Sequence, residues 1–311
     1  MSLALKELIK IGEKQLADAG VRDSQIDAKE LFCYMMGYDK VGLMMHWQDI
    51  MADNQCEAYF DLVGERASRV PLQHITGEQE FMGHKFKVNS DVLIPRQDTE
   101  TMVEDAIQLI SMGSFRGNLY NEDAKMKDNP DVLDLCCGSG AIGISIAKAY
   151  PRASVVCSDI SKEALALAGE NAKSNSAKNV KFVESDMLGA AYFNGKLKTK
   201  KFDLIISNPP YIQSAVIETL EPEVKDHEPR MALDGGEDGL DFYRRIAEDA
   251  AAHLKKNGVL MMEIGYDQKD TVKNLLAENG GYEKIIGLAD LAGLDRIVVA
   301  RKKQEEKKHK K

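Results

Sequence analysis

The sequence lacks any long hydrophobic run. None of its apolar stretches reaches the roughly 20 residues that a helix needs to cross a membrane. The first ten residues also lack an apolar core, because Lys6, Glu7 and Lys10 interrupt them. We therefore expect neither a membrane span nor a signal peptide, and a cytoplasmic location.

Cysteine is scarce, and neither cysteine nor histidine shows the spacing of a metal site. The chain has five cysteines, an odd number, with no Cys-x-x-Cys pair. Cys136 and Cys137 are adjacent, which is a poor geometry for a disulfide bridge. The six histidines form no His-Glu-x-x-His pattern. These absences predict reduced thiols and no bound metal.

Positive charge is also in deficit. Lys and Arg number 41 against 50 Asp and Glu, which gives a net charge of −9. Proteins that hold long nucleic acids usually carry a basic face, so this balance argues against a nucleic-acid substrate. The basic run at residues 301–311 has no apolar periodicity. We expect residues 302–311 to form a disordered, solvated tail, with affinity for RNA or the ribosome as the alternative.

The composition is that of a globular protein. Apolar residues make up 44% and charged residues 29% of a 311-residue chain, a length that accommodates two domains. From residue 98 onward, apolar runs of strand length alternate with stretches of helical spacing. This alternation predicts an α/β fold with a mostly parallel sheet covered on both faces. The expected strands begin at Val132 and span Ser154–Asp159, Val180–Val183, Asp203–Ser207, Gly258–Ile264, Tyr282–Ile286 and Arg296–Ala300; the expected helices are Asp98–Met112, Ala141–Tyr150, Gly239–Lys255 and Asp267–Glu278.

The N-terminal part has a different pattern. Apolar residues recur at helical spacing from Leu3 to Leu16, and Asp27–Met36 and Asn54–Arg69 form two further helical segments. We therefore predict a small helical domain at residues 1–75.

Between and after these helices, several segments have a turn or loop composition. Two short extended stretches between Phe81 and Ile94 predict a hairpin around Asn89-Ser90-Asp91. Residues 113–130 and 192–201 are polar and non-periodic, so we expect exposed loops there. The predicted order is thus a linker with the hairpin at 76–97 and a second domain at 98–301.

The most informative stretch follows the expected strand Asp203–Ser207. Two consecutive prolines in Asn208-Pro209-Pro210-Tyr211 exclude both helix and ladder pairing, so the chain leaves the sheet there in a stiff conformation. The strand end thus presents an amide, a carbonyl and an aromatic ring at the edge where α/β folds bind ligands. A purely structural turn is the alternative, because Pro-Pro is common in loops.

Another strand end carries a glycine-rich turn. The segment Cys136-Cys137-Gly138-Ser139-Gly140 precedes a helix, an arrangement that lets backbone N–H groups approach a ligand. With Gly143, the glycines match the Gly-x-Gly-x-x-Gly pattern of dinucleotide sites, which alone is weak evidence. Asp159 ends the next strand, where a carboxylate can accept hydrogen bonds from both hydroxyls of a ribose. Asp134 is either a buried structural acid or a ligand contact.

A further acid follows the strand Val180–Val183. We expect Asp186 to accept a hydrogen bond from an adenine amino group and Met187 to lie against the ring, with core packing as the alternative for Met187. Four successive strand ends therefore carry a glycine loop, two acids and Asn208-Pro209-Pro210-Tyr211. The ordered set is far more specific than any of its members.

On these residues the chain resembles the Rossmann-like class I methyltransferases that use S-adenosylmethionine. Within that class, Asn-Pro-Pro-Tyr is typical of enzymes that methylate planar amide or exocyclic amino nitrogens. More narrowly, the chain resembles the family that methylates the glutamine side-chain amide of class I peptide chain release factors. The narrower resemblance rests on five stretches: Gln73–Gly83, Ile94–Glu100, Glu228–Gly236, Asp238–Arg244 and Asp290–Arg296.

The resemblance implies a seven-stranded sheet with an antiparallel last strand, S-adenosylmethionine as cofactor, and a release factor as protein substrate bound by the helical domain. It implies methylation of the glutamine in a Gly-Gly-Gln motif and leaves the oligomeric state open. The implied cofactor-binding residues are Cys136, Cys137, Gly138, Ser139, Gly140, Asp159, Asp186, Met187 and Asn208. The implied substrate-binding residues are Asn208, Pro209, Pro210 and Tyr211, of which Asn208, Pro209 and Tyr211 are the expected catalytic residues.

The chemistry of this resemblance requires positioning above all. An amide nitrogen is a poor nucleophile because its lone pair is delocalised, whereas a sulfonium methyl group is already activated. Holding the two in line can lower the barrier by several kcal/mol, up to roughly 7–11. We expect the Asn208 side-chain oxygen and the Pro209 carbonyl to accept the two N–H groups of the substrate amide, and Tyr211 to pack on its plane.

The sequence departs from the family at two positions. Cys136 stands where the family has glycine, which requires this position to accept ordinary backbone angles. Gln97 stands where the family has proline, in the turn before Asp98, which we expect to be the N-cap of the following helix.

Three other functions compete with this one. A DNA or RNA methyltransferase acting on adenine N6 or guanine N2 is the main alternative, because the same strand end fits the exocyclic amine of a flipped base. A nicotinamide dehydrogenase would use the glycine loop but leaves Asn208-Pro209-Pro210-Tyr211 unexplained. A non-catalytic partner-binding protein has no need of Asp159 and Asn208.

Overall fold

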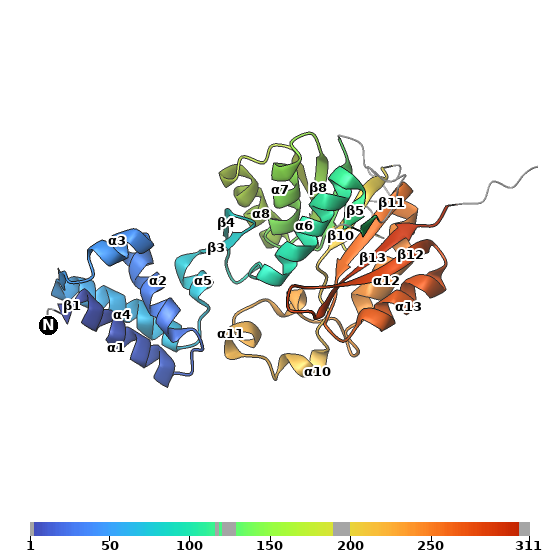
Figure 1. Cartoon of the computed structure of the whole chain (residues 1–311). Coiled ribbons are helices and arrows are strands. Elements are labelled where there is room, and N and C mark those ends of the chain that lie inside the picture. The colour runs from blue at the N-terminus through green and yellow to red at the C-terminus, as the bar shows by residue number, and fades with distance from the viewer. Residues whose placement is uncertain (1–2, 116–117, 120–128, 189–199, 305–311) are drawn as a thin grey trace, which may run out of the picture. The chain divides into compact units, whose positions relative to one another are not determined.

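The computed structural model describes residues 3–115, 118–119, 129–188 and 200–304 (Figure 1). The predicted tail lies outside the described residues from 305 onward, and so do 116–117, 120–128 and 192–199 of the predicted loops. The chain divides into two compact units. A helical unit comprises Met1–Glu78 and Leu220–Glu228, and a sheet unit comprises Gln79–Thr219 and Pro229–Lys311. In the described part of the chain, no helix is both long and apolar enough to cross a membrane.

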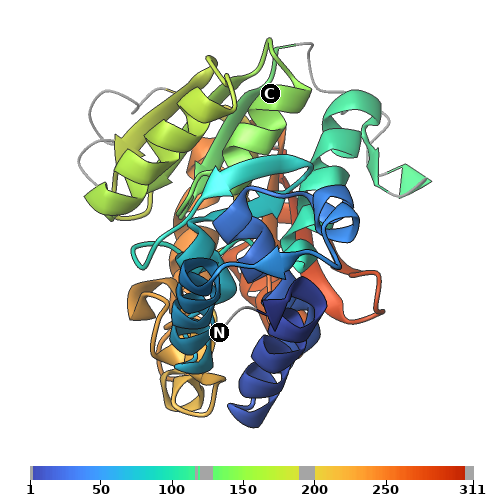
Figure 2. The same ribbon diagram turned by 90° about the vertical axis from the view of Figure 1, so that its left-hand side faces the viewer.

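The helical unit packs its helices around an apolar core. They are α1 (Leu5–Asp18), α2 (Ser24–Met36), α3 (Lys40–Met45), α4 (Asp53–Ala67) and α5 (Leu72–Thr76), and can be followed in Figure 2. The unit also includes α11 (Pro222–Lys225), which buries none of its residues. A short strand β1 (Leu3–Ala4) pairs antiparallel with β2 (Ile50–Met51). Leu8, Leu31 and Phe32 are fully buried, as the helical spacing of apolar residues requires. The Tyr59 hydroxyl, also buried, donates to the Ala28 carbonyl at 3.0 Å.

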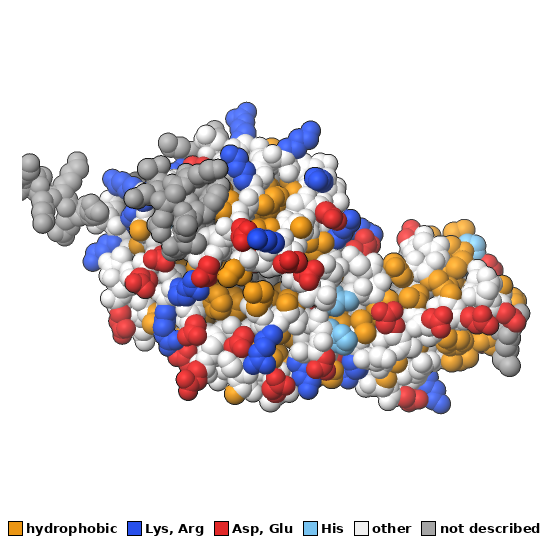
Figure 3. All heavy atoms as spheres, turned by 180° about the vertical axis from the view of Figure 1, so that it is seen from behind, with side chains coloured by type: hydrophobic (Ala, Val, Ile, Leu, Met, Phe, Trp, Pro, Cys, Tyr) orange, Lys and Arg blue, Asp and Glu red, His pale blue; other side chains and the backbone are white. Residues whose placement is uncertain are grey.

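The surface of the helical unit exposes large apolar side chains. Figure 3 shows hydrophobic side chains gathered on this unit, at the right of the view. Met44 and Met45 are each 77% exposed, and Ile26 is 58% exposed. Ile26 and Met44 border a groove of about 570 Å³, which we call the helical groove. Its lining residues are Ile26, Lys29, Glu30, Cys33, Lys40, Leu43, Met44 and Trp47.

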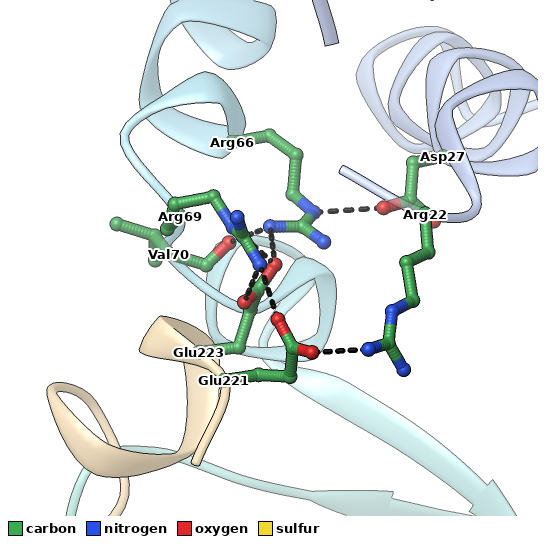
Figure 4. A network of polar contacts seen from close by, with 7 residues as sticks. All are labelled: Arg22, Asp27, Arg66, Arg69, Val70, Glu221 and Glu223. Atoms are coloured by element: carbon green, nitrogen blue, oxygen red, sulfur yellow. Dashed lines mark hydrogen bonds and ion pairs between the residues drawn. The ribbon is translucent and has the colours of Figure 1, made fainter. Parts of the chain in front are cut away.

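Ion pairs fasten residues 220–228 to the helices of this unit (Figure 4). Arg66 and Arg69 donate to Oε1 of Glu223 at 3.0 and 2.7 Å, and Arg69 also donates to Glu221. Arg66 further donates to Asp27 at 2.7 Å. The side chains of Arg66, Asp27 and Glu223 are 8%, 8% and 17% exposed, so removing one partner would leave a buried charge uncompensated. Burial raises the pKa of Glu223, but hydrogen bonds from Arg69 and Arg66 outweigh this and hold the pKa at about 2.

The sheet unit contains a seven-stranded sheet in the order β12-β13-β11-β10-β7-β8-β9. Its strands are β7 (Asp131–Leu135), β8 (Ser154–Asp159), β9 (Val180–Glu184), β10 (Phe202–Ser207), β11 (Leu254–Glu263), β12 (Tyr282–Ala289) and β13 (Asp295–Lys302). Strands β7 to β11 pair parallel, and β13 is antiparallel to both β11 and β12. The predicted α/β fold, with seven strands and an antiparallel last strand, is confirmed.

Helices cover both faces of this sheet (Figure 1). They are α6 (Gln97–Met112), α7 (Ala141–Ala149), α8 (Lys162–Ser174), α12 (Asp241–His253) and α13 (Lys269–Asn279). Val132 and Leu204 pack with the core of α6 and α7, whereas their neighbours Leu133 and Ile205 pack with the core of α12 and α13. Successive strand residues point to opposite faces, which is why the strands are apolar throughout rather than alternating.

The predicted hairpin exists, but its position was wrong. The paired strands are β3 (Glu78–Phe81) and β4 (His84–Lys87), and the chain turns at Met82 and Gly83, not at Asn89-Ser90-Asp91. Both turn residues have positive φ, 51° and 69°, which is the geometry of a two-residue hairpin turn. Methionine at the first turn position hides this signal. The Asn89 side chain instead accepts from the Asp91 N–H at 3.0 Å in a local turn.

The predicted N-cap of α6 was also wrong. The helix begins at Gln97, so Arg96 is the cap residue and Asp98 lies in the first turn. The first helical position favours proline, which explains why the family has proline where this chain has Gln97. Asp98 still suits its place, because a carboxylate in the first turn interacts favourably with the helix dipole.

Short elements complete the sheet unit. Two strands, β5 (Ser114–Phe115) and β6 (Asn118–Leu119), pair where an unstructured loop was expected. A pairing two residues wide needs no side-chain periodicity, so it leaves no pattern in the sequence. After β10 come α10 (Ser214–Ile217) and the 3-10 turn η1 (Arg230–Ala232).

Candidate active site

A cavity of about 480 Å³ opens at the carboxyl ends of β7, β8, β9 and β10. This is the edge at which open parallel sheets bind ligands, and the volume is that of a small-molecule site. Of the residues predicted from the sequence, the cavity is lined by Cys136, Cys137, Gly138, Ser139, Asp159, Asp186, Met187, Asn208 and Pro210. Gly140, Pro209 and Tyr211 are not part of its lining.

The glycine loop is held against the end of β8. The Gly138 N–H donates to Oδ2 of Asp159 at 2.8 Å, and the Cys137 N–H donates to the Ser158 carbonyl at 3.0 Å. A Cβ atom on Gly138 would meet no protein atom within 4 Å, so this glycine faces open space that a ligand can fill. A Cβ on Gly140 would lie 2.9 Å from Cδ1 of Ile144, so Gly140 serves the packing of the loop on its helix.

Cys136 contradicts the expectation of ordinary backbone angles. Its φ is +60°, in the left-handed region that glycine adopts freely and other residues adopt at a cost of about 1–2 kcal/mol. The chain bends sharply between β7 and the loop, and the glycine of the family would adopt this bend without strain. The Cys136 sulfur lies 3.7 Å from Sδ of Met187. Burial raises the pKa of the Cys136 thiol, which therefore stays protonated.

Asp134 holds the start of the helix that follows the glycine loop. It is fully buried, and its Oδ2 accepts from the Gly143 N–H at 2.8 Å. Burial, with a contribution from the nearby Asp159, raises the pKa of Asp134 to about 7. A Cβ on Gly143 would lie 2.4 Å from the Cys157 sulfur, so close packing of helix on strand requires this glycine. Asp134 does not line the cavity, which favours the structural interpretation over direct ligand contact.

Two acids border the cavity at the ends of β8 and β9. Asp159 accepts backbone N–H groups from Gly138 and from Ser161, the latter at 3.0 Å on Oδ1. These bonds fix its carboxylate, whose remaining lone pairs are available to a ligand. Asp186 pairs with Arg245 of α12 at 2.7 Å, and both residues line the cavity. Met187 belongs to the apolar core and also lines the cavity, so its place against an adenine ring stays a prediction.

A buried hydrogen-bond chain runs beneath Asn208. Asn208 Nδ2 donates to Oγ1 of Thr99 at 3.3 Å, and Thr99 donates to Oε2 of Glu263 at 2.6 Å. The Tyr211 hydroxyl donates to Oε1 of Glu263 at 3.4 Å, and Tyr211 is not among the residues that line the cavity, so its packing on a substrate amide stays a prediction. Burial raises the pKa of Glu263 to about 7.

Sequence reasoning missed three residues of this site. Arg245, Thr99 and Glu263 were not singled out, although Arg245 and Thr99 line the cavity. Glu263 carried a signal, because it is an acid at the carboxyl end of an otherwise apolar strand. Thr99 and Arg245 lie on helices and carried none that a single sequence would reveal.

The segment after η1 packs its backbone against the residue that follows the two prolines. A Cβ on Gly235 would lie 2.7 Å from Cα of Tyr211, and the Gly235 N–H donates to the Ile212 carbonyl at 2.8 Å. The Tyr211 carbonyl in turn accepts from Nε2 of Gln268 at 3.0 Å. Tyr211 is therefore held from both sides, which supports the stiff conformation expected of this stretch.

No three His, Cys, Asp or Glu side chains gather into a metal-binding group among the residues with described positions. A glycine loop, an acid at the end of β8 and an amide after β10, on a sheet with a reversed last strand, define a Rossmann-like methyltransferase. The family model of the methyltransferase small domain matches residues 118–222, and that of the PrmC N-terminal domain matches residues 7–77.

Curated relatives extend over nearly the whole chain. The release factor glutamine methyltransferase of Clostridium botulinum is 37% identical over 96% of this chain and 100% of its own length. Those of Clostridium acetobutylicum and Geobacter sulfurreducens are each 39% identical, over 90% and 92% of this chain and 90% and 92% of their own lengths. The chain belongs to the release factor glutamine methyltransferase family. Among solved structures, a methyltransferase from Pyrococcus furiosus aligns over 72% of this chain and 91% of its own with a TM-score of 0.48 at 17% identity, a likeness too weak to bear on function.

Proposed function

We propose that this protein transfers a methyl group from S-adenosylmethionine to the side-chain amide nitrogen of the glutamine in the Gly-Gly-Gln motif of class I release factors. Membership of the family supports the substrate, and the carboxamide of Asn208 at the rim of a cofactor-sized cavity supports the chemistry. The sulfonium of the bound cofactor supplies the activated methyl group.

The residues of the cavity fit the cofactor. Asp159 has a fixed carboxylate for the ribose hydroxyls, and Gly138 leaves open space in front of the loop backbone. Cys136, Cys137 and Ser139 would line the path of the amino-acid end, with Gly140 holding the loop on its helix. Asp186 and Met187 would border the adenine. The pairing of Asp186 with Arg245 adds a cation at this end of the cavity.

The substrate amide would be held by two acceptors. The side-chain oxygen of Asn208 and the carbonyl of Pro209 would accept its two N–H groups, and the rigid ring of Pro210 would keep that carbonyl aimed outward. Such fixed acceptors favour the positive charge that develops on nitrogen during transfer. The nitrogen loses its proton to water after methylation, so no general base is assigned. Tyr211 would pack on the plane of the substrate amide, with its hydroxyl bonded to Glu263.

We further propose that the helical domain at residues 1–75 binds the release factor and that residues 98–301 form the catalytic domain. The exposed Ile26 and Met44 at the helical groove support a protein partner over a nucleic acid. The net charge of −9 points the same way. A cytoplasmic location fits a partner of this kind.

The decisive experiment incubates the purified protein with isotopically labelled S-adenosylmethionine and a class I release factor. Mass spectrometry should find one added methyl group on the glutamine of the Gly-Gly-Gln motif. Asn208→Ala should lower the rate on the order of 100-fold or more while cofactor binding persists by calorimetry. Full activity of that variant would contradict the role of Asn208, and methylation of an oligonucleotide instead of the release factor would favour the nucleic-acid alternative.

A further inference from the structure

Glu263 has no assigned role in the chemistry described so far. Its carboxylate nevertheless accepts the second of the two hydrogen bonds that run from Asn208 through Thr99. It is 2% exposed, and Thr99, which connects it to Asn208, is 4% exposed. Glu263 is an unusual structural choice, because burying an ionisable carboxyl costs free energy that burying an apolar side chain would not. Its connection to the Asn208 amide, which must face the substrate in one orientation, suggests that Glu263 helps to set that orientation.

The direction of the hydrogen bonds in this chain is determined by Glu263. An ionised carboxylate can only accept, so the Thr99 hydroxyl must donate its proton to Glu263, at 2.6 Å. The Thr99 oxygen then offers only lone pairs on its other side. It can therefore accept from the NH2 group of Asn208, at 3.3 Å, but cannot donate to the oxygen of that amide.

We infer that Glu263, acting through the Thr99 hydroxyl, sets the orientation of the Asn208 carboxamide, so that its NH2 group faces Thr99 and its oxygen faces the substrate. An amide nitrogen to be methylated presents two N–H donors, which need acceptors. A flipped Asn208 would present its own NH2 to those donors and would repel the substrate group that it is proposed to hold. Glu263 and Thr99 are thus positioning residues, and this inference rests on the proposed function.

Protonation of Glu263 would remove this control. A carboxylic acid can donate to Thr99, which frees the Thr99 proton to point at Asn208 and to stabilise the flipped amide. The charged and titratable groups around Glu263 come from several elements: Arg296 of β13, Asp98 of α6, Tyr211 after β10 and Tyr243 of α12. Burial is the largest influence and raises the pKa of Glu263 to about 7, although Arg296 lowers it. The active orientation should therefore be lost as the pH falls below about 7.

The test compares four enzymes in the release factor assay: wild type, Thr99→Val, Thr99→Ser and Glu263→Gln. Valine matches threonine in shape but lacks the hydroxyl, and its kcat should fall roughly 10-fold or more while KM for the cofactor changes little. Serine keeps the hydroxyl and should restore most of the activity that valine loses. Glutamine cannot ionise but keeps an acceptor oxygen for Thr99, so its kcat should not change over the pH range in which Glu263 titrates.

The pH profile separates this role from mere support of the fold. Wild-type kcat should rise about tenfold per pH unit below an apparent pKa near 7 and level off above it, because one proton controls the orientation. Glu263→Gln should lack that rise, while thermal unfolding and cofactor calorimetry confirm that it is folded. The inference is overturned if Thr99→Val has wild-type kcat, or if Glu263→Gln keeps the wild-type pH profile.

Failure of the proposed function would look different. If wild-type enzyme transfers no methyl group to the release factor glutamine at any pH, the function is wrong whatever the variants do. If the wild type is active and the variants match it, the function stands and the orienting role of Glu263 is wrong.

Discussion

Replacing Cys136 by glycine should make the sheet unit more stable than replacing it by alanine. Cys136 has a φ of +60°, at which a Cβ atom costs about 1–2 kcal/mol. Alanine keeps this Cβ and glycine does not. Both variants lose the sulfur that lies 3.7 Å from Sδ of Met187, so the difference between them isolates the backbone strain.

The expected size of the difference follows from two opposing contributions. Glycine removes about 1–2 kcal/mol of strain. It also gives the unfolded chain more freedom, which costs about 0.5–1 kcal/mol. At the midpoints of these two ranges, about 1.5 and about 0.75 kcal/mol, the net advantage of glycine over alanine at Cys136 is about 0.75 kcal/mol. Since 1 kcal/mol shifts the midpoint of a unit this size by about 2–4 °C, the two variants should differ by about 1.5–3 °C.

Differential scanning calorimetry of wild type and both variants, without cofactor, measures this directly. The unfolding midpoint of wild type should be close to that of the glycine variant, because wild type keeps the contact of the Cys136 sulfur with Met187 but also carries the backbone strain. An alanine variant as stable as the glycine variant, or more so, would mean that Cys136 is not strained and that the bend after β7 is relaxed in solution.

Three further changes have defined outcomes. Glu223→Gln should destabilise the helical unit by up to about 3 kcal/mol at pH 7, because the folded-state pKa of about 2 lies below the ordinary 4.5 and folding therefore favours the ionised form. In urea titrations, the stability difference between wild type and variant should persist above pH 4.5 and vanish as the pH falls toward 2. A difference that does not depend on pH would contradict this. Glu263→Gln should become more stable relative to wild type as the pH rises from 4.5 through about 7, by up to about 3 kcal/mol, because the raised pKa means that ionisation of the native glutamate opposes folding. The prediction would be refuted if the difference in unfolding midpoint between variant and wild type were the same at pH 5 and at pH 8.5. Gly143→Ala places a Cβ 2.4 Å from the Cys157 sulfur and should lower the free energy of unfolding by about 1–3 kcal/mol. Gly169→Ala is the matched helical control, since a Cβ there would meet no atom within 4 Å, and it should be neutral or stabilising by up to about 1 kcal/mol. Similar unfolding midpoints for the two variants would argue against close packing at Gly143.

The sheet could be predicted because each of its strands is a short apolar run that ends in a distinctive residue. Asp159 and Asn208 follow such runs, and parallel topology brings their ends to one edge without any further information. The same reasoning could not find Thr99, whose contact with Asn208 depends on how α6 packs over the sheet. It found the acid of β11 only as part of a strand, because a burial pattern does not tell where a carboxylate points.

Backbone conformation was the least predictable feature. Met82 and Cys136 both adopt positive φ, and neither residue type indicates it. In each case the surrounding structure imposes the turn: β3 and β4 pair on either side of Met82, and Cys136 must connect β7 to a loop held by Asp159. Local preference is worth about 1 kcal/mol, which such long-range pairing overrides.

The return of residues 220–228 to the helical unit has a practical consequence for anyone who wishes to study that unit in isolation. The polypeptide passes between the two units at residues 78, 219 and 228, so truncation after residue 78 discards part of the fold. Arg66 and Arg69 would then lose Glu223, and the shielded guanidinium of Arg66 would keep Asp27 alone as its acidic partner in the network of Figure 4. A fragment of the first 78 residues should consequently be unstable, and grafting the 220–228 peptide onto its end through a flexible spacer should rescue it.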